Sequence, residues 1–265
     1  MKDIDELKKI AILIDAENAQ ASVIKNILNE ISVHGHIIVK RAYGDWSKDS
    51  LKSWKDVLNL HAIQPEQQFS YTSGKNSSDA KMIIDAMDLL YTGKFDAFVL
   101  VTSDSDFTSL ATRLKQSEIY VFGVGENKTP LSFRNACDDF ILTENLKESD
   151  SNSVSSITHQ HASPENTNIS TEETSNIGTE NKNNPFEIIE LLEKGWEIYH
   201  DDTDYVNAAG VGQYIKRSKP DFDVRSYGCT KLPELISKLS QYFETKEYKG
   251  KGGVKVFAYK PKNQH

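Results

Sequence analysis

Short apolar runs alternate with amphipathic stretches along the first 146 residues of the chain. The runs have the length of strands buried on both faces of a sheet, and they lie at 10–14, 37–39, 95–101, 119–124 and 140–142, with a shorter strand near Ile63. Helical spacing of apolar residues fills the intervals, at 23–31, 51–58, 79–90, 107–114 and 131–136. This alternation predicts an α/β domain, in which helices cover a parallel sheet.

The pattern stops at Glu148 and resumes near Asn184. Ser, Thr, Asn and Glu dominate the intervening segment, and large apolar residues are almost absent. Such a composition buries too little surface to offset the entropy cost of ordering, which predicts a disordered linker. We therefore expect a first domain at 1–147, a linker at 148–183 and a second domain at 184–265.

The second domain begins with a helix-start signal, because Asn184, Pro185 and Glu187 occupy the N-cap, N1 and N3 positions. Apolar spacing predicts three helices, the last of them through Leu232–Leu239. Two strands then flank the glycine-rich segment 250–253, which is typical of a hairpin. Three helices followed by a hairpin predict a small winged helix-turn-helix domain.

Carboxylates follow two of the predicted strands. Asp15 comes directly after the strand at 10–14, and Asp104 and Asp106 follow the strand at 95–101. In an open α/β sheet, ligands bind outside the carboxyl ends of the strands. Helix capping is an alternative interpretation, with Ser103 or Asp104 as the N-cap and Asp106 in the first turn of a helix.

Asp79 is harder to explain by capping. It falls near the centre of an apolar stripe on the helix that follows, formed by Met82, Ile83, Ala86, Leu89 and Leu90. A carboxylate at the head of such a stripe needs a partner, since burying an unpaired charge is costly. The first turn of this helix is expected at the same edge as Asp15 and Asp104. Asp85 lies further down the helix, and we interpret it as structural, paired with a neighbouring element.

Four carboxylates at one edge would raise each other's pKa unless a cation lay between them. Oxygen ligands of this kind suit Mg²⁺ or Mn²⁺. The chemistry that fits is metal-assisted hydrolysis of a phosphodiester, which needs no covalent nucleophile. Ser103 and Thr102 have no histidine nearby in the sequence, so we interpret them as loop or supporting groups.

Composition narrows the class of protein. The 265 residues carry a net charge of −8, no apolar run approaches a membrane span, and the first residues lack the apolar core of a signal peptide. Cys137 and Cys229 belong to no cluster with zinc spacing, so we expect a reduced, cytoplasmic protein without structural zinc. An acidic chain would bind nucleic acid only through local basic patches, and the stretch from Glu244 supplies one, with six Lys against two Glu.

Three segments together resemble the NYN domain, a PIN-like nuclease fold also found in LabA-type bacterial proteins. They are Ile12–Asn18, Lys75–Asp79 and Val101–Phe107, and the resemblance covers about residues 8–146. It implies a PIN-like, Rossmannoid sheet and an RNA endonuclease. The metal-binding acids would be Asp15, Asp79, Asp104 and Asp106, and Asn18 would contribute beside Asp15.

Residues 184–262 resemble the OST-HTH or LOTUS domain, with Tyr227–Leu232 leading into the third helix. That family implies RNA binding, including guanine-rich structures, although some members bind protein helices instead. Expected partners are therefore single-stranded or structured RNA, with a protein bound by the C-terminal domain or a second copy of the chain as further candidates. We expect the linker to keep this domain near the nuclease site without fixing its geometry.

Candidate RNA contacts come from both domains. Tyr43 and Lys75 follow strand ends near the acids, and a basic set is expected on or before the third helix and on the hairpin. That set consists of Arg225, Lys231, Lys238, Lys249, Lys251 and Lys255. In this role the side chains would meet phosphates.

Two alternatives stay open. In the first, the nuclease-like domain has become a non-catalytic RNA-binding adaptor. In the second, Asp104-Ser105-Asp106-Phe107-Thr108 is the Asp-x-Asp-x-Thr motif of a haloacid-dehalogenase-like phosphatase. That motif normally follows the first strand of its fold, whereas here it follows a fourth, and Asp15, Asn18 and Asp79 would have no role.

Overall fold

The computed structural model describes residues 9–69, 77–147, 185–200, 204–249, 253 and 255–262. The predicted linker, 148–183, lies outside these ranges. None of the helices within them has the length and apolar character needed to cross a bilayer.

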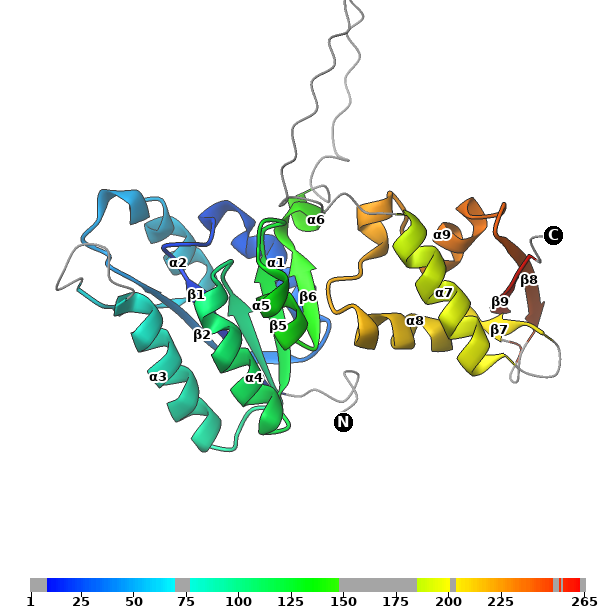
Figure 1. Cartoon of the computed structure of the whole chain (residues 1–265). Coiled ribbons are helices and arrows are strands. Elements are labelled where there is room, and N and C mark those ends of the chain that lie inside the picture. The colour runs from blue at the N-terminus through cyan, green and yellow to red at the C-terminus, as the bar shows by residue number, and fades with distance from the viewer. Residues whose placement is uncertain are drawn as a thin grey trace, which may run out of the picture.

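Six parallel strands form the sheet of the N-terminal domain, in the order β3-β2-β1-β4-β5-β6 (Figure 1). Their bounds are β1 Lys9–Asp15, β2 His36–Gly44, β3 Gln64–Gln67, β4 Ala97–Val101, β5 Tyr120–Gly125 and β6 Asp139–Leu142. The predicted α/β class with a parallel, PIN-like sheet is confirmed. The second strand is longer than its apolar run suggested, since β2 continues through Arg41, Ala42 and Tyr43.

Helices cover both faces of this sheet. Alternate residues of β1 point to opposite sides, with Ile12 in one buried cluster and Leu13 in the other. The first cluster is completed by α1, α2 and α6, and the second by α3, α4 and α5. The helix bounds are α1 Ile24–Ser32, α2 Trp54–His61, α3 Ser77–Tyr91, α4 Thr108–Gln116, α5 Leu131–Ala136 and α6 Thr143–Lys147.

The order of the strands reverses at β1. The chain runs outward from β1 to β2 and β3, and α3 then carries it back to β4, which pairs with the other side of β1. The carboxyl ends of β1 and β4 therefore form a topological switch point, which is where ligands bind in open α/β sheets. Asp15 and Asp104 stand at these two ends.

The C-terminal domain is a winged helix, as predicted. Three helices, α7 (Pro185–Tyr199), α8 (Ala208–Ser218) and α9 (Leu232–Lys238), surround a separate buried cluster. The hairpin of β8 (Phe243–Lys249) and β9 (Lys255–Pro261) packs against them, and the two-residue strand β7 (Val206–Asn207), which was not predicted, pairs with β9.

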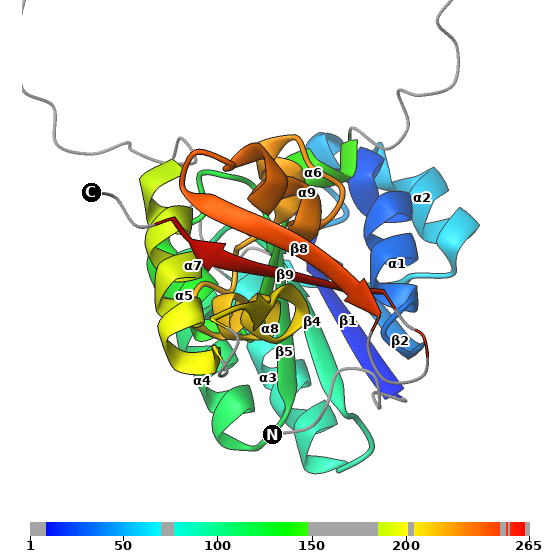
Figure 2. The ribbon, with the colours of Figure 1, turned by 90° about the vertical axis from the view of Figure 1, so that its right-hand side faces the viewer.

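The two domains touch. The C-terminal domain lies beside β6, the edge strand of the large sheet (Figure 1), and the backbone N–H of Phe140 in β6 donates to the Pro220 carbonyl at 2.9 Å. Viewed from that side, α8, α9 and the hairpin stand in front of the sheet (Figure 2). The expected tether without fixed geometry is not what the structure shows, because described residues of the two domains contact one another directly.

Candidate functional site

Four of the expected acids come to the switch point from three different elements. Asp15 ends β1, and Asp79 lies in the first turn of α3. Asp104 follows β4 and caps a short 3-10 helix, Ser105–Phe107, whose first turn contains Asp106. Their assembly at one edge follows from the parallel sheet, because both strand ends and the start of α3 lie there.

The Asp15 carboxylate is buried and held by four hydrogen bonds. The Asn18 side-chain amide and the Thr102 hydroxyl donate to Oδ2 at 2.7 and 3.0 Å. The backbone N–H groups of Glu17 and Asn18 donate to Oδ1 at 3.2 and 3.3 Å. Burial raises the pKa of the Asp15 carboxyl, and these hydrogen bonds oppose that rise. Asn18 therefore lies beside Asp15 and orients its carboxylate.

Asp79, Asp104 and Asp106 form the tightest acidic group. One carboxylate oxygen from each lies within 4.8 Å of the others. Asp79 is only 7% exposed, and no described residue donates a hydrogen bond to its side chain. Burial, with the negative charges of Asp15 and Asp104, raises the pKa of Asp79 to about 6. The repulsion between carboxylates that the sequence led us to expect is thus present, and it raises the pKa of Asp79.

Capping and ligand roles coexist at Asp104. Its Oδ1 accepts a hydrogen bond from the Asp106 backbone N–H at 2.9 Å, which is the capping contact that the alternative interpretation required. The same carboxylate contributes an oxygen to the acidic group. The capping hydrogen bond holds the Asp104 side chain beside Asp79 and Asp106, so capping and metal binding by Asp104 are compatible.

Glu17 was not expected at the site. Its Oε1 accepts from Lys48 Nζ at 2.7 Å and from the Asp45 backbone N–H at 3.3 Å, and its Oε2 accepts from the Ser78 hydroxyl at 3.3 Å. Burial acts to raise its pKa, but the hydrogen bonds from Lys48, the Asp45 backbone and Ser78, with the charge of Lys48, together outweigh burial, and the pKa of Glu17 is lowered. Its charge also adds to the field on Asp79. The only signal for Glu17 in the sequence was its place two residues after Asp15.

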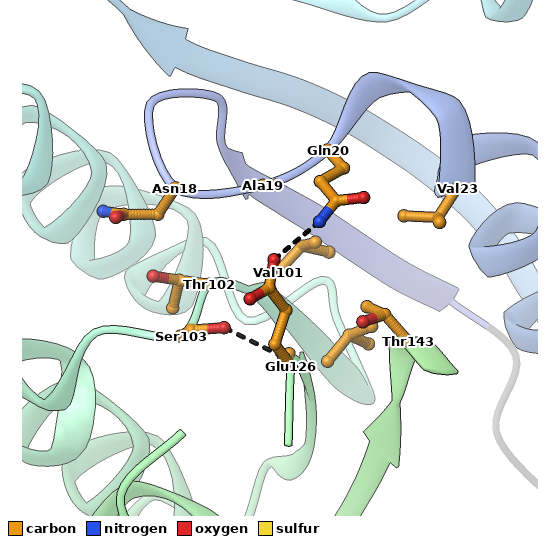
Figure 3. Close-up of a pocket in the computed structure, with 11 residues that line it drawn as sticks. Asn18, Ala19, Gln20, Val23, Val101, Thr102, Ser103, Glu126 and Thr143 are labelled. Atoms are coloured by element: carbon orange, nitrogen blue, oxygen red, sulfur yellow. Dashed lines mark hydrogen bonds between the residues drawn. The ribbon is translucent and has the colours of Figure 1, made fainter. Parts of the chain in front are cut away.

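A small pocket opens beside the acids, between the ends of β1, β4 and β5 (Figure 3). Its apolar lining comes from Val23, Val101 and Val124. Gln20 reaches across to Glu126, with Nε2 and Oε1 2.8 Å apart. Gly125 permits the close approach of β5, since a Cβ there would lie 2.6 Å from the Thr102 carbonyl oxygen. The pocket shares Asn18, Thr102 and Ser103 with the surroundings of the acids.

The donor set fits a hard divalent cation. Its ligand atoms are all carboxylate oxygens, and the buried Asp79 has no other described partner for its charge. Asp15 is not part of this group of three, but it is near enough to raise the Asp79 pKa. Asp79, Asp104 and Asp106 are therefore the residues that could hold such an ion, with Asp15 beside them.

The structural interpretation of Asp85 is confirmed. Its Oδ1 pairs with Arg41 Nη1 at 2.5 Å, and its Oδ2 accepts a hydrogen bond from the Tyr43 hydroxyl. Both partners come from β2, across the face of the sheet that α3 covers. This arrangement corrects the expectation for Tyr43. Its side chain is 0% exposed and bonded to Asp85, so it does not present a surface to RNA.

The other expected RNA contacts divide into three groups. Lys75 and Lys251 lie outside the described residues. Arg225 is occupied at the domain boundary, where it pairs with Asp223 at 2.7 Å and with Glu30 at 3.0 Å. Four described lysines of this set are exposed: Lys231 at the N-cap of α9, Lys238 in α9, and Lys249 and Lys255 on the hairpin. Lys238 also donates to the Gly228 carbonyl, so among the described residues Lys231, Lys249 and Lys255 are the accessible candidates without such a backbone contact.

Comparison with known families identifies both parts of the chain. The model of the NYN domain matches residues 9–145, and the model of the OST-HTH/LOTUS domain matches residues 185–254. No curated protein matches significantly.

Two solved structures align with part of the chain. A crystal structure of a protein of unknown function from Vibrio parahaemolyticus aligns with 18% identity and a TM-score of 0.44, covering 54% of this chain and 96% of that one. A solution structure of an uncharacterised protein from Nitrosomonas europaea aligns with 24% identity and a TM-score of 0.27, covering 41% of this chain and 95% of that one.

Proposed function

Because the chain belongs to the NYN domain family and carries an OST-HTH/LOTUS domain after it, we propose that it is a metal-dependent RNA endonuclease. The first domain is nuclease-like and the second is of an RNA-binding type. The observation that carries the proposal is the convergence of Asp79, Asp104 and Asp106, with ligand oxygens within 4.8 Å of one another. The proposed cofactor is Mg²⁺ or Mn²⁺.

Each residue of the site has a distinct part in this proposal. Asp79, Asp104 and Asp106 would hold the cation, which would supply an activated water molecule and stabilisation of the negative charge on the phosphate. Asp15 adds negative charge at the same edge, and its orientation is maintained by Asn18 and Thr102. The Glu17–Lys48 pair borders the site, and in this proposal the Lys48 ammonium lies where a phosphate of the RNA backbone would approach.

The acids explain why no nucleophilic side chain is required. In phosphodiester hydrolysis a water oxygen attacks phosphorus, and the bond from phosphorus to the leaving oxygen breaks. Two hydroxyls beside the acids have contacts of their own: Thr102 donates to Asp15, and Ser103 accepts the backbone N–H of Glu126 at 2.9 Å. We assign them supporting roles.

Cleavage of end-labelled single-stranded RNA tests the proposal. Full-length protein is compared with Asp104→Asn in Mn²⁺, in Mg²⁺ and in EDTA. Asparagine caps a helix about as well as aspartate, so this variant should keep its fold while losing a charged ligand. Asp88→Asn is the matched control, because Asp88 is an exposed acid of the same domain away from the cluster.

We expect metal-dependent cleavage by the wild type and by Asp88→Asn, and none by Asp104→Asn. Binding of the RNA without cleavage under all metal conditions would instead indicate the non-catalytic adaptor. Hydrolysis of a fluorogenic phosphate monoester, with intact RNA, would indicate a phosphatase.

A further inference from the structure

The N-terminal domain contains a buried arginine whose carboxylate partner belongs to the other domain. Arg134 in α5 is 1% exposed. Its Nε donates to the Thr129 carbonyl at 2.8 Å, and one terminal nitrogen donates to the Asn127 carbonyl. The other, Nη1, pairs with Asp221 Oδ2 of the C-terminal domain at 3.0 Å. Among the described residues, Asp221 is the one carboxylate that pairs with this guanidinium.

A second set of contacts covers the open edge of the sheet. An edge strand carries unpaired backbone groups, and β6 is the edge strand here. The N–H of Phe140 is satisfied by the Pro220 carbonyl, and the neighbouring Asp139 pairs with Lys216 of α8 at 2.5 Å. The C-terminal domain thus occupies the position in which a further strand or a partner protein would otherwise pair.

A third set lies away from β6. Arg225 pairs with Glu30 of α1 at 3.0 Å, and the Asn145 amide in α6 donates to the Ser226 hydroxyl at 2.9 Å. The three sets involve four elements of the sheet domain, α1, α5, β6 and α6. Because the contacts are distributed in this way, the C-terminal domain cannot rotate about one contact without breaking the others.

The docked segments leave the candidate RNA surface open. The contacts use α8 and residues 219–226, whereas Lys231, Lys249 and Lys255 take no part in them and are exposed. In Figure 1, α9 lies toward the same end of the molecule as α6, which follows the carboxyl end of β6. The acids also lie at the carboxyl ends of the strands.

We propose that the C-terminal domain is a fixed part of the enzyme, docked on β6 through Arg134–Asp221 and Asp139–Lys216, so that RNA held by it is cut at a set distance from the bound segment. The inference about cutting rests on the proposed nuclease function. The inference about docking stands on the contacts alone.

A charge-exchange variant tests the docking in the full chain. Lys216→Glu combined with Asp221→Lys leaves the net charge unchanged but places like charges opposite Asp139 and Arg134. Arg217→Glu combined with Glu193→Lys makes the same exchange at two exposed positions of the C-terminal domain and serves as the control. Spin labels on cysteines introduced at the exposed positions Lys94 and Ser240 report the distance between the domains, since Cys137 and Cys229 are both buried.

We expect one narrow distance distribution for the wild type and the control, and a broad one for the Lys216→Glu, Asp221→Lys variant. A broad distribution in the wild type, or a narrow one in all three proteins, would overturn the docking proposal.

The cutting pattern is read on an end-labelled single-stranded RNA with one guanine-rich segment. Wild type and control should cut within a narrow window relative to that segment, and the exchange variant at scattered positions. Scattered cuts by the wild type, or an identical window in all three proteins, would overturn the set distance. No cleavage by any protein, together with narrow wild-type distances, would contradict the nuclease function and leave the docking supported, so the two failures are distinguishable.

Discussion

The Thr102 hydroxyl donates a hydrogen bond to Asp15 Oδ2 at 3.0 Å and so joins the carboxyl ends of β4 and β1. The Thr102 hydroxyl oxygen in turn accepts a hydrogen bond from the Asp104 backbone N–H at 3.1 Å. One buried side chain therefore positions the first acid of the site and the loop that carries two others. Residues that orient metal-binding groups in this way commonly matter nearly as much as the ligands.

Thr102→Val tests this relationship, because valine has nearly the same shape but neither donates nor accepts. We expect cleavage to fall by about 10- to 100-fold. The free energy of unfolding should fall by about 1 to 3 kcal/mol, since an unpaired buried group is left behind. Cleavage rates and urea unfolding measure the two effects. Thr102→Ser keeps the hydroxyl and should retain most activity; equal losses in both variants would show that the hydroxyl is unimportant.

Asp79→Asn should stabilise the metal-free protein near neutral pH. The pKa of Asp79 is raised to about 6, so in the folded chain the ionised form is disfavoured. The free energy of unfolding of the wild type therefore falls as the pH rises from about 4 to about 6. Removing the charge in Asp79→Asn should raise the free energy of unfolding at pH 7 by about 1 to 2 kcal/mol, after allowance for solvent screening. Below pH 4 the difference should vanish, because the wild-type carboxyl is then protonated in both states.

Urea unfolding in EDTA at pH 4 and pH 7 measures this effect, with Asp88→Asn as the control of equal charge change. Calorimetric titration with Mn²⁺ provides the second readout, and we expect Asp79→Asn to lose affinity. A stability gain of the same size at both pH values would rule out titration of Asp79 as its source.

Asp85→Asn should behave in the opposite way. Asp85 supports Arg41 and Tyr43 rather than the acidic group, so neutralising it leaves the partly buried guanidinium with only the 4.0 Å contact to Glu66 among the described residues. We expect a loss of about 2 kcal/mol in the free energy of unfolding and an unchanged Mn²⁺ affinity. Tyr43→Phe, which removes one of the two contacts and no charge, should lose less. Weakened Mn²⁺ binding in Asp85→Asn would mean that the site extends further down α3.

The acids of the site were predictable because each is tied to a local pattern. Asp15 and Asp104 follow apolar strands, and Asp79 heads an apolar helical stripe, so the parallel sheet alone brings them to one edge. Tyr43 was misplaced because its strand is longer than the apolar run at 37–39. Continued to Gly44, the strand buries Tyr43 beneath α3, where it meets Asp85.

The contacts that were not predicted join distant parts of the chain. Lys48 is 31 positions from Glu17, and Asp221 is 87 positions from Arg134. Neither pair leaves a periodic or spaced signal in the sequence. Arg134 in particular is one arginine on a short helix: the carbonyls of Asn127 and Thr129 that it binds are close in the chain, but its carboxylate partner comes from the second domain.

Lys249→Gln with Lys255→Gln should weaken RNA binding without affecting the chemistry. Both residues lie on the hairpin, Lys249 at the end of β8 and Lys255 at the start of β9, directly opposite each other in the antiparallel register. Among the described residues, the ion pair of Lys255 is a long, 4.0 Å contact with Glu247, and its side chain is 83% exposed, so little there competes for its charge. If each lysine neutralises one phosphate of single-stranded RNA, the slope of log affinity against log salt concentration should fall by about 0.7 per lysine.

Fluorescence anisotropy across a series of salt concentrations measures that slope, and the cleavage rate at saturating protein shows whether the chemistry is intact. Lys94→Gln is the matched control, because Lys94 is exposed in the turn before β4, at the edge opposite the acids. An unchanged slope in the hairpin variant would mean that the hairpin does not contact the RNA backbone. A reduced slope with a lowered cleavage rate at saturation would mean instead that the hairpin positions RNA for cutting, as a rigidly docked domain would.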